Sequence, residues 1–338
     1  MKGVGKIRRY LPALLWYAQR RVRGAVGTVL KLVEGRAMKI EGVIAATVTP
    51  FTKDGVNYGG LKTLLSKVVE AGYHGVFPTS STGEVTKLTP EERVRVMEVA
   101  KEAAGGKALV VGGTGTGDHL STIEIARRYK DVGVDVLLIT PPYYIQYDWA
   151  ALYAFYKKVL DKVDMPTILY TIPLATGYNI PVEVFELVAN EYSQVVGVKD
   201  SSGDFRYHLD LIHLLGRRLS VLQGLDMLFV PSLVMGAHGG VLAGPNFLGR
   251  ITLEQYRLVK EGKIQEAVAL HNKLMPLWRF MGGCGLVGKL GGKWPTLYKV
   301  AAQLVHGTDM GPPREPLPPI DDKDRKELEK LLKELGLI

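Results

Sequence analysis

From residue 38 onward, short apolar segments alternate with longer amphipathic segments. Eight of the short segments are nearly continuous apolar runs, which is typical of parallel strands covered by helices. These predicted strands are residues 43–49, 75–79, 108–112, 134–140, 167–171, 195–198, 220–224 and 239–243. The intervening segments repeat their apolar residues with the helical period, and several begin with proline and acidic residues. The predicted helices are residues 61–71, 90–104, 119–132, 149–163, 181–192, 205–215 and 227–235, with one more beginning near Thr252.

Eight β–α units predict an α/β fold, a TIM (β/α)8 barrel with a C-terminal helical extension. The competing interpretation is a nucleotide-binding fold with an open sheet, for which GGTGTGD at residues 112–118 is the candidate loop. This loop lacks the GxGxxG spacing and follows the third unit instead of opening the chain. We therefore interpret it as a glycine-lined strand end of the barrel.

Three regions are expected along the chain. Residues 1–37 form a basic N-terminal extension, residues 38–262 form the barrel, and residues 263–338 form a C-terminal helical region. The segment GPPREPLPPI at residues 311–320 is expected to be an extended connector. The last 18 residues read as an amphipathic helix with acidic residues at its start.

The formal net charge of +9 is concentrated at the N-terminus. Residues 1–37 contain nine Lys or Arg residues and one acidic residue, Glu34, so they carry +8 of this total. The remaining residues are nearly neutral and offer no electrostatic footprint for DNA or RNA. Nucleic-acid binding is not expected.

The N-terminal region superficially resembles a secretory signal, because the basic RRY is followed by an apolar stretch. That stretch lasts only from Leu11 to Ala18 and is not followed by a small-residue cleavage site. A basic amphipathic surface helix is an alternative. We favour the interpretation that Met38 is the natural start and that residues 1–37 are an appendage. Cys284 is the only cysteine and no apolar run is long enough to span a membrane, so a cytoplasmic location is expected.

Polar residues collect where the predicted strands end, and in a TIM barrel these ends form the active face. The stretch VVGVKDSSG places Lys199 directly after an apolar run. Either the strand ends at Val198 and the lysine reaches water, or the lysine is partly desolvated and acts as an amine nucleophile. Tyr170 occupies the equivalent place on the neighbouring strand, where a phenol could carry protons for imine chemistry. Because the hydroxyls of Ser81 and Thr82 fall on the same rim, the functional interpretation is preferred.

Several ordered motifs support a family resemblance. From Met38 to the C-terminus the chain contains SSTGE, TPPYY, LYTIP followed by TG, GVKDSSG and HGGVLAG, and in these it resembles the dihydrodipicolinate synthase / N-acetylneuraminate lyase family of class I aldolases. The resemblance implies a pyruvate-type Schiff base on Lys199 with proton transfer through Tyr170. It also implies that Ser81 and Thr82 bind or activate the 2-oxo acid carboxylate, with Ser81 in a proton relay.

The same resemblance has further implications for assembly and cofactors. Tyr144 would belong to the hydroxyl relay and is often lent across a subunit interface in this family. Val241 would contact the substrate through its backbone. Such enzymes are generally homotetramers that use no metal and no organic cofactor, and their partners are a small 2-oxo acid and an aldehyde.

Departures from the family pattern guide the choice of reaction. Ser80 replaces the usual glycine before the Ser/Thr pair. Pro173 is followed by Leu174 and Ala175, whereas dihydrodipicolinate synthases have an arginine two residues after this proline for the second substrate's carboxylate. The ATG ending of LYTIPLATG is most similar to archaeal 2-keto-3-deoxygluconate aldolases. The predicted reaction is reversible cleavage of a 2-oxo-3-deoxy sugar acid to pyruvate and an aldehyde.

Four alternatives remain open at this point. Condensation of pyruvate with aspartate semialdehyde (4-hydroxy-tetrahydrodipicolinate synthase) is the runner-up, and dehydration of a related 2-oxo acid would use the same imine. A non-catalytic sensor of 2-oxo acids would keep the pocket without turnover. A metal-dependent aldolase is disfavoured because the seven histidines are scattered and show no HxH or HxxxH spacing.

Overall fold

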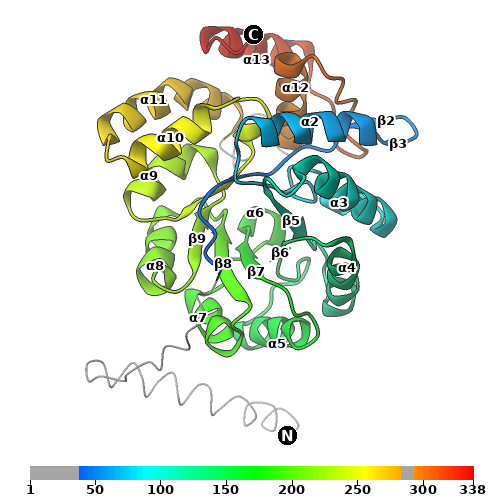
Figure 1. The fold of residues 1–338 in the computed structure, drawn as a ribbon, viewed down its shortest axis with the longest axis vertical. Coiled ribbons are helices and arrows are strands. Elements are labelled where there is room, and N and C mark those ends of the chain that lie inside the picture. Colours follow the sequence, from blue (N-terminus) through cyan, green and yellow to red (C-terminus); the bar gives the residue numbers. More distant parts are fainter. Residues whose placement is uncertain (1–37, 283–292) are drawn as a thin grey trace, which may run out of the picture. The chain divides into compact units, whose positions relative to one another are not determined.

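The computed structural model describes residues 38–282 and 293–338. Within these residues, eight parallel strands form a closed barrel with helices around its outside (Figure 1). The strands are β1 (Gly42–Ala45), β4 (Gly75–Val76), β5 (Leu109–Gly113), β6 (Val136–Ile139), β7 (Thr167–Thr171), β8 (Val195–Asp200), β9 (Ser220–Gln223) and β10 (Gly239–Leu242). They follow one another in sequence order around the barrel, and β10 pairs with β1 to close it. The prediction of a TIM-like barrel is confirmed.

The helices of the β–α units cover the barrel and overlap the predicted segments, with ends that differ by a few residues. They are α2 (Tyr58–Glu70), α3 (Pro90–Ala104), α4 (His119–Val132), α5 (Trp149–Leu160), α7 (Val182–Glu191), α8 (Phe205–Leu215), α9 (Phe229–Val234) and α10 (Ile251–Lys260). Local sequence explains their starts. For α3, Thr89 and Glu92 form a reciprocal capping box and Pro90 occupies the first turn, where no backbone donor is needed.

The C-terminal region is helical, as the sequence indicates. It contains α11 (Ile264–Phe280), α12 (Trp294–His306) and α13 (Asp322–Glu334). Asp321 caps α13 by accepting a hydrogen bond from the backbone N–H of Asp324, and the buried leucines of this helix lie on one face. The proposed boundary at residues 262/263 falls in the short turn between α10 and α11. The N-terminal extension lies outside the described residues.

The structure corrects the sequence-based boundaries at the rim. The first two strands end at Ala45 and Val76, so the polar residues after them belong to loops. The predicted helix at 227–235 is split into a short 3-10 helix, Asp226–Leu228, followed by α9. A small hairpin of β2 (Phe51–Thr52) and β3 (Gly55–Val56) and the one-turn helix α6 (Pro173–Thr176) had not been predicted.

The sixth strand is the most consequential correction. The sequence predicted its end at Val198, but β8 continues through Lys199 to Asp200. Side chains alternate between the two faces of a strand, so Lys199 points into the barrel and Asp200 points toward the surrounding helices. The interpretation in which Lys199 reaches water is therefore wrong, since this residue is only 3% exposed.

Candidate active site

Lys199 and Tyr170 occupy the same register position on neighbouring parallel strands, β8 and β7. The Lys199 amine lies 4.2 Å from the centroid of the Tyr170 ring and 5.3 Å from that of Phe77. Tyr170 is also 3% exposed. In the described part of the chain, no carboxylate lies within 4.0 Å of the amine. Lys199 is thus a buried amine packed on aromatic faces, which is the setting a lysine nucleophile requires.

The Tyr170 hydroxyl has a partner that the sequence-based site did not include. It lies 3.2 Å from the Ser201 hydroxyl, and both groups are buried. Ser201 follows Lys199 by two positions, so the two side chains share one face of the chain. This period-2 relationship was a usable signal in KDSSG and would have identified Ser201. The two hydroxyls thus form a buried pair, and the lysine amine lies over the ring of the same tyrosine.

Five of the six sequence-predicted site residues line one cavity at the mouth of the barrel. They are Lys199, Tyr170, Ser81, Thr82 and Val241. Ser81 and Thr82 sit in the loop after β4, opposite the lysine strand. Ser80 shapes this loop because its hydroxyl accepts a hydrogen bond of 2.9 Å from the Gly83 N–H. The serine that departs from the family pattern therefore stabilises the loop from within.

Tyr144 is the exception among the predicted residues. Its side chain is 97% exposed, and it does not line the cavity of its own chain. Its backbone has a φ of 80°, a left-handed conformation that costs a tyrosine about 1–3 kcal/mol and is typical of functional positions.

Gly224 provides the space that the lysine and serine occupy. A Cβ atom at this position would lie 2.0 Å from the Ser201 Oγ and 3.0 Å from the Lys199 Cε. No neighbour could relieve both contacts without moving the reactive groups. The glycine in the GLD segment thus has a steric explanation, which the sequence alone did not reveal.

Helix α12 supplies part of the cavity wall. Its residues Trp294 and Tyr298 line the cavity together with Leu174 of α6. No sequence signal indicated these contacts, because they depend on how the C-terminal region packs on the barrel. The Tyr298 hydroxyl donates to the carboxylate of Asp226 at 3.4 Å, and the backbone N–H groups of Ala243 and Gly244 donate to the same carboxylate. Burial raises the pKa of Asp226 to about 6, against the lowering effect of these hydrogen bonds.

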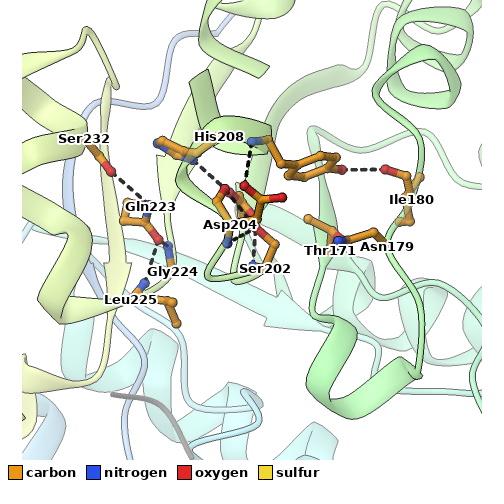
Figure 2. A network of polar contacts seen from close by, with 12 residues as sticks. Thr171, Asn179, Ile180, Ser202, Asp204, His208, Gln223, Gly224, Leu225 and Ser232 are labelled. Carbon is orange, nitrogen blue, oxygen red and sulfur yellow. Dashed lines mark hydrogen bonds and ion pairs between the residues drawn. The ribbon is translucent and has the colours of Figure 1, made fainter. Parts of the chain in front are cut away.

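A second polar network joins the ends of β8 and β9 to α8 and α9 (Figure 2). The Asp200 carboxylate lies 2.9 Å from Nδ1 of His208 on α8 and accepts a hydrogen bond from the Ser202 N–H. Gln223, paired in register with Asp200, donates to the Ser232 hydroxyl and accepts from the backbone N–H groups of Gly224 and Leu225. These contacts hold the ends of β8 and β9, on which Lys199 depends.

Residues 38–282 and 293–338 contain no group of three or more His, Cys, Asp or Glu side chains that could hold a metal ion. Nor does this part of the chain contain a helix long and apolar enough to cross a membrane.

Fold and site together define a (β/α)8 barrel with a buried lysine and a tyrosine on adjacent strands. Comparison with known proteins identifies the family to which this barrel belongs. The Dihydrodipicolinate synthetase family matches residues 39–335, and the chain belongs to this family.

Relatives and solved structures agree with this assignment. The chain is 91% identical over 301 residues to an uncharacterized DapA-like lyase of Pyrobaculum islandicum, covering 89% of this chain and 100% of that protein. It is 35% identical over 302 residues to a 4-hydroxy-tetrahydrodipicolinate synthase of Methanopyrus kandleri, covering 89% of this chain and 98% of that one. Among crystal structures, it resembles the E. coli K12 prophage protein YagE, of the dihydrodipicolinic acid synthase family, in complex with pyruvate. The TM-score is 0.82 and the identity 25%, with 88% of this chain and 99% of that chain covered.

Proposed function

We propose that the protein is a Schiff-base-forming lyase that reversibly cleaves a 2-oxo-3-deoxy sugar acid to pyruvate and an aldehyde. The observation that carries this proposal is the buried pair of Lys199 and Tyr170, matched in register with the amine 4.2 Å from the ring centroid. Membership of the family and the similarity to a structure in complex with pyruvate support the same chemistry.

The site residues can carry each step. The amine of Lys199 adds to the C2 ketone to give a carbinolamine, and Tyr170 gives its proton to the carbinolamine hydroxyl, so that water leaves and a protonated imine forms. The Tyr170 oxygen, supported by Ser201, then takes the C4 hydroxyl proton. The electron pair of the C3–C4 bond moves toward the imine nitrogen, which releases the aldehyde and leaves an enamine. Tyr170 returns the proton to C3, and water hydrolyses the protonated imine to pyruvate and the free amine, with the released proton returning to the Tyr170 oxygen.

The hydroxyl loop would hold the carboxylate end of the substrate. Ser81 and Thr82 line the cavity on the side away from the lysine strand, and hydroxyl and backbone donors suit a carboxylate. In our proposal Thr82 and the backbone of Val241 bind the 2-oxo acid, while Ser81 extends the proton relay toward Tyr144.

The wall of the cavity favours a sugar acid as substrate. Of the described residues that line it, Lys199 is the only charged one. Ala175 stands two residues after Pro173, where dihydrodipicolinate synthases carry an arginine, so a second substrate with its own carboxylate would lack the cationic partner that this arginine provides. This supports specificity like that of 2-keto-3-deoxygluconate aldolases.

Condensation of pyruvate with aspartate semialdehyde is the second candidate. It is favoured by one specific observation, the 35% identity to the M. kandleri protein named 4-hydroxy-tetrahydrodipicolinate synthase. The absence of an arginine after Pro173 speaks against it.

An assay of pyruvate release separates these functions. The protein is incubated with 2-keto-3-deoxygluconate, and pyruvate is measured with lactate dehydrogenase. In parallel, pyruvate is offered with glyceraldehyde or with aspartate semialdehyde. We expect cleavage and glyceraldehyde condensation, both lost in Lys199→Ala, and aspartate semialdehyde condensation only after Ala175→Arg. Condensation with aspartate semialdehyde by the unaltered chain would establish the second candidate, and loss of water without aldehyde release would indicate a dehydratase.

We further propose that the active form is a homotetramer in which Tyr144 reaches the cavity of a neighbouring subunit. The side chains of Tyr144, Ile145 and Leu120 are all exposed, as is Leu174 at the cavity mouth. Large apolar side chains exposed at the rim of a site are typical of interaction surfaces. The strained φ of Tyr144 would then be stabilised by the partner.

A further inference from the structure

The loop that carries Ser81 and Thr82 ends in a buried acidic residue, Glu84, which is held by the distant C-terminal region. The Glu84 Oε1 atom accepts a hydrogen bond of 2.7 Å from the Lys299 amine of α12. The side chains of Glu84 and Lys299 are 0% and 1% exposed. A fully buried ion pair gains little net stability over apolar packing, so it suggests a role in specifying one arrangement.

The second carboxylate oxygen is also occupied. The Glu84 Oε2 atom accepts the backbone N–H of Arg314 at 3.0 Å, and Lys299 donates in addition to the Pro312 carbonyl at 3.1 Å. The pKa of Lys299 is lowered, because the effect of burial exceeds the opposing effect of the Glu84 charge. Both oxygens of Glu84 therefore contact residues more than 200 positions away in sequence.

Arg314 is itself fixed at three points. Its guanidinium forms two hydrogen bonds of 2.6 Å with the Glu92 carboxylate and donates to the Lys87 carbonyl at 2.7 Å. It also stacks 4.5 Å from the centroid of the Phe51 ring, over which Lys299 lies at 4.4 Å. The position of the Arg314 backbone N–H, and with it that of Glu84, is thus well defined.

The loop is also closed by two backbone hydrogen bonds of 3.1 Å, from the Glu84 N–H to the Ser81 carbonyl and from the Val85 N–H to the Ser80 carbonyl. Glu84 has a φ of 58°, a left-handed conformation that a non-glycine residue keeps only when its surroundings enforce it. The Gly83 carbonyl accepts from the Thr49 hydroxyl at 2.7 Å, and the Gly83 N–H donates to Ser80. Ser81 and Thr82 lie between these anchors, two or three residues before the ion pair.

We infer that Lys299 and Arg314 are positioning residues, which hold Ser81 and Thr82 against the 2-oxo acid through Glu84. The C-terminal helical region is then part of the active site as well as of the fold. This inference rests on the proposed function, because it assumes that the loop binds a 2-oxo acid whose ketone reacts with Lys199.

Borohydride trapping of pyruvate on Lys199 tests this positioning without knowledge of the aldehyde. The half-saturating pyruvate concentration and the maximal trapping rate are measured for the full chain. We expect Lys299→Met to raise the half-saturating concentration about tenfold or more, because small displacements of binding groups have large effects, and to leave the maximal rate nearly unchanged.

Lys299→Met leaves the Glu84 charge buried without its partner, which can destabilise the fold. Two further variants therefore test the same inference without leaving this buried charge unpaired. Glu84→Gln combined with Lys299→Met removes both charges, and Arg314→Leu removes only the partly exposed guanidinium fork. Both are expected to raise the half-saturating concentration. The matched control Lys330→Met alters an exposed lysine of α13 and is expected to leave it unchanged.

The outcomes distinguish the two proposals. A lower melting temperature with an unchanged half-saturating concentration in all three variants means that the ion pair is only structural, and overturns the inference. If borohydride nevertheless traps pyruvate on the unaltered protein, the proposed function stands although the inference about positioning does not. A complete absence of trapping in the unaltered protein overturns the proposed function and this inference with it.

Discussion

The hydroxyl of Ser201, the residue directly after the strand that carries Lys199, lies 3.2 Å from the hydroxyl of Tyr170. In the proposed mechanism, this contact gives the phenol a buried partner for the proton that it releases and takes back during imine chemistry. Because Tyr170 pairs in register with Lys199, the three groups are placed by two adjacent strands. Rigid strands position reactive groups more accurately than loops do.

The first prediction concerns this proton path. Tyr170→Phe is expected to lower the turnover number for aldehyde release by about 10²–10⁴-fold, the usual contribution of a positioned general acid–base group. Ser201→Ala should have a smaller effect, because the phenol remains. Steady-state kinetics with 2-keto-3-deoxygluconate check both. Equal activity of Tyr170→Phe and the unaltered protein would exclude Tyr170 from proton transfer.

The second prediction concerns the space around the lysine. Gly224→Ala places a methyl group 2.0 Å from the Ser201 Oγ, so we expect a loss of about 1–3 kcal/mol in unfolding free energy and a large loss of pyruvate trapping. Gly59→Ala is the matched control, because its Cβ would meet only Asn57 Oδ1 at 3.7 Å. Thermal unfolding and trapping measure the two effects. A Gly224→Ala variant that behaves like Gly59→Ala would contradict the described geometry.

The third prediction concerns pH. Burial raises the pKa of Asp226 to about 6, above its ordinary value of 3.8. Between these values the folded state binds more protons than the unfolded state, so this residue makes the stability fall as pH rises from about 4 to about 6. We expect the loss between pH 4.5 and 7 to be about 2 kcal/mol larger in the unaltered protein than in Asp226→Asn. Denaturant titrations at the two pH values measure this difference, and identical pH profiles would refute the raised pKa.

The fourth prediction concerns Tyr144. Chains with Tyr144→Phe and chains with Lys199→Ala should each have low activity. Co-expressed, they should regain part of it, because a mixed oligomer contains sites with an intact lysine and a partner's intact tyrosine. Activity and light scattering of the purified mixed species provide the measurement. Absence of recovery in a verified mixed oligomer would show that Tyr144 does not act across subunits.

Much of the architecture could be predicted because it is encoded locally. Each strand and helix of the barrel has its own hydrophobic period, and the count of β–α units places Lys199, Tyr170, Ser81 and Thr82 on one rim. The end of β8 was predicted too early because a Lys-Asp pair usually marks a strand end. In the structure, the Asp200 carboxylate contacts the buried imidazole of His208. Because its carboxylate has this buried partner, Asp200 can be part of the strand.

Long-range contacts explain what the sequence could not provide. Trp294 and Tyr298 reach the cavity, and Lys299 reaches Glu84, only because α12 packs against the barrel mouth. No local pattern in α12 distinguishes these residues from an ordinary amphipathic helix. Gly224 is similar, since its role depends on side chains of another strand.

The central claim is that Lys199 forms an imine with a 2-oxo acid. The most direct measurement is intact-mass and peptide analysis after incubation with pyruvate and borohydride, with Lys199→Ala as the control. The account predicts a stable adduct on the peptide that contains Lys199 and none in the variant. A folded protein that gains no adduct, or gains it on another lysine, would contradict the proposed lyase chemistry.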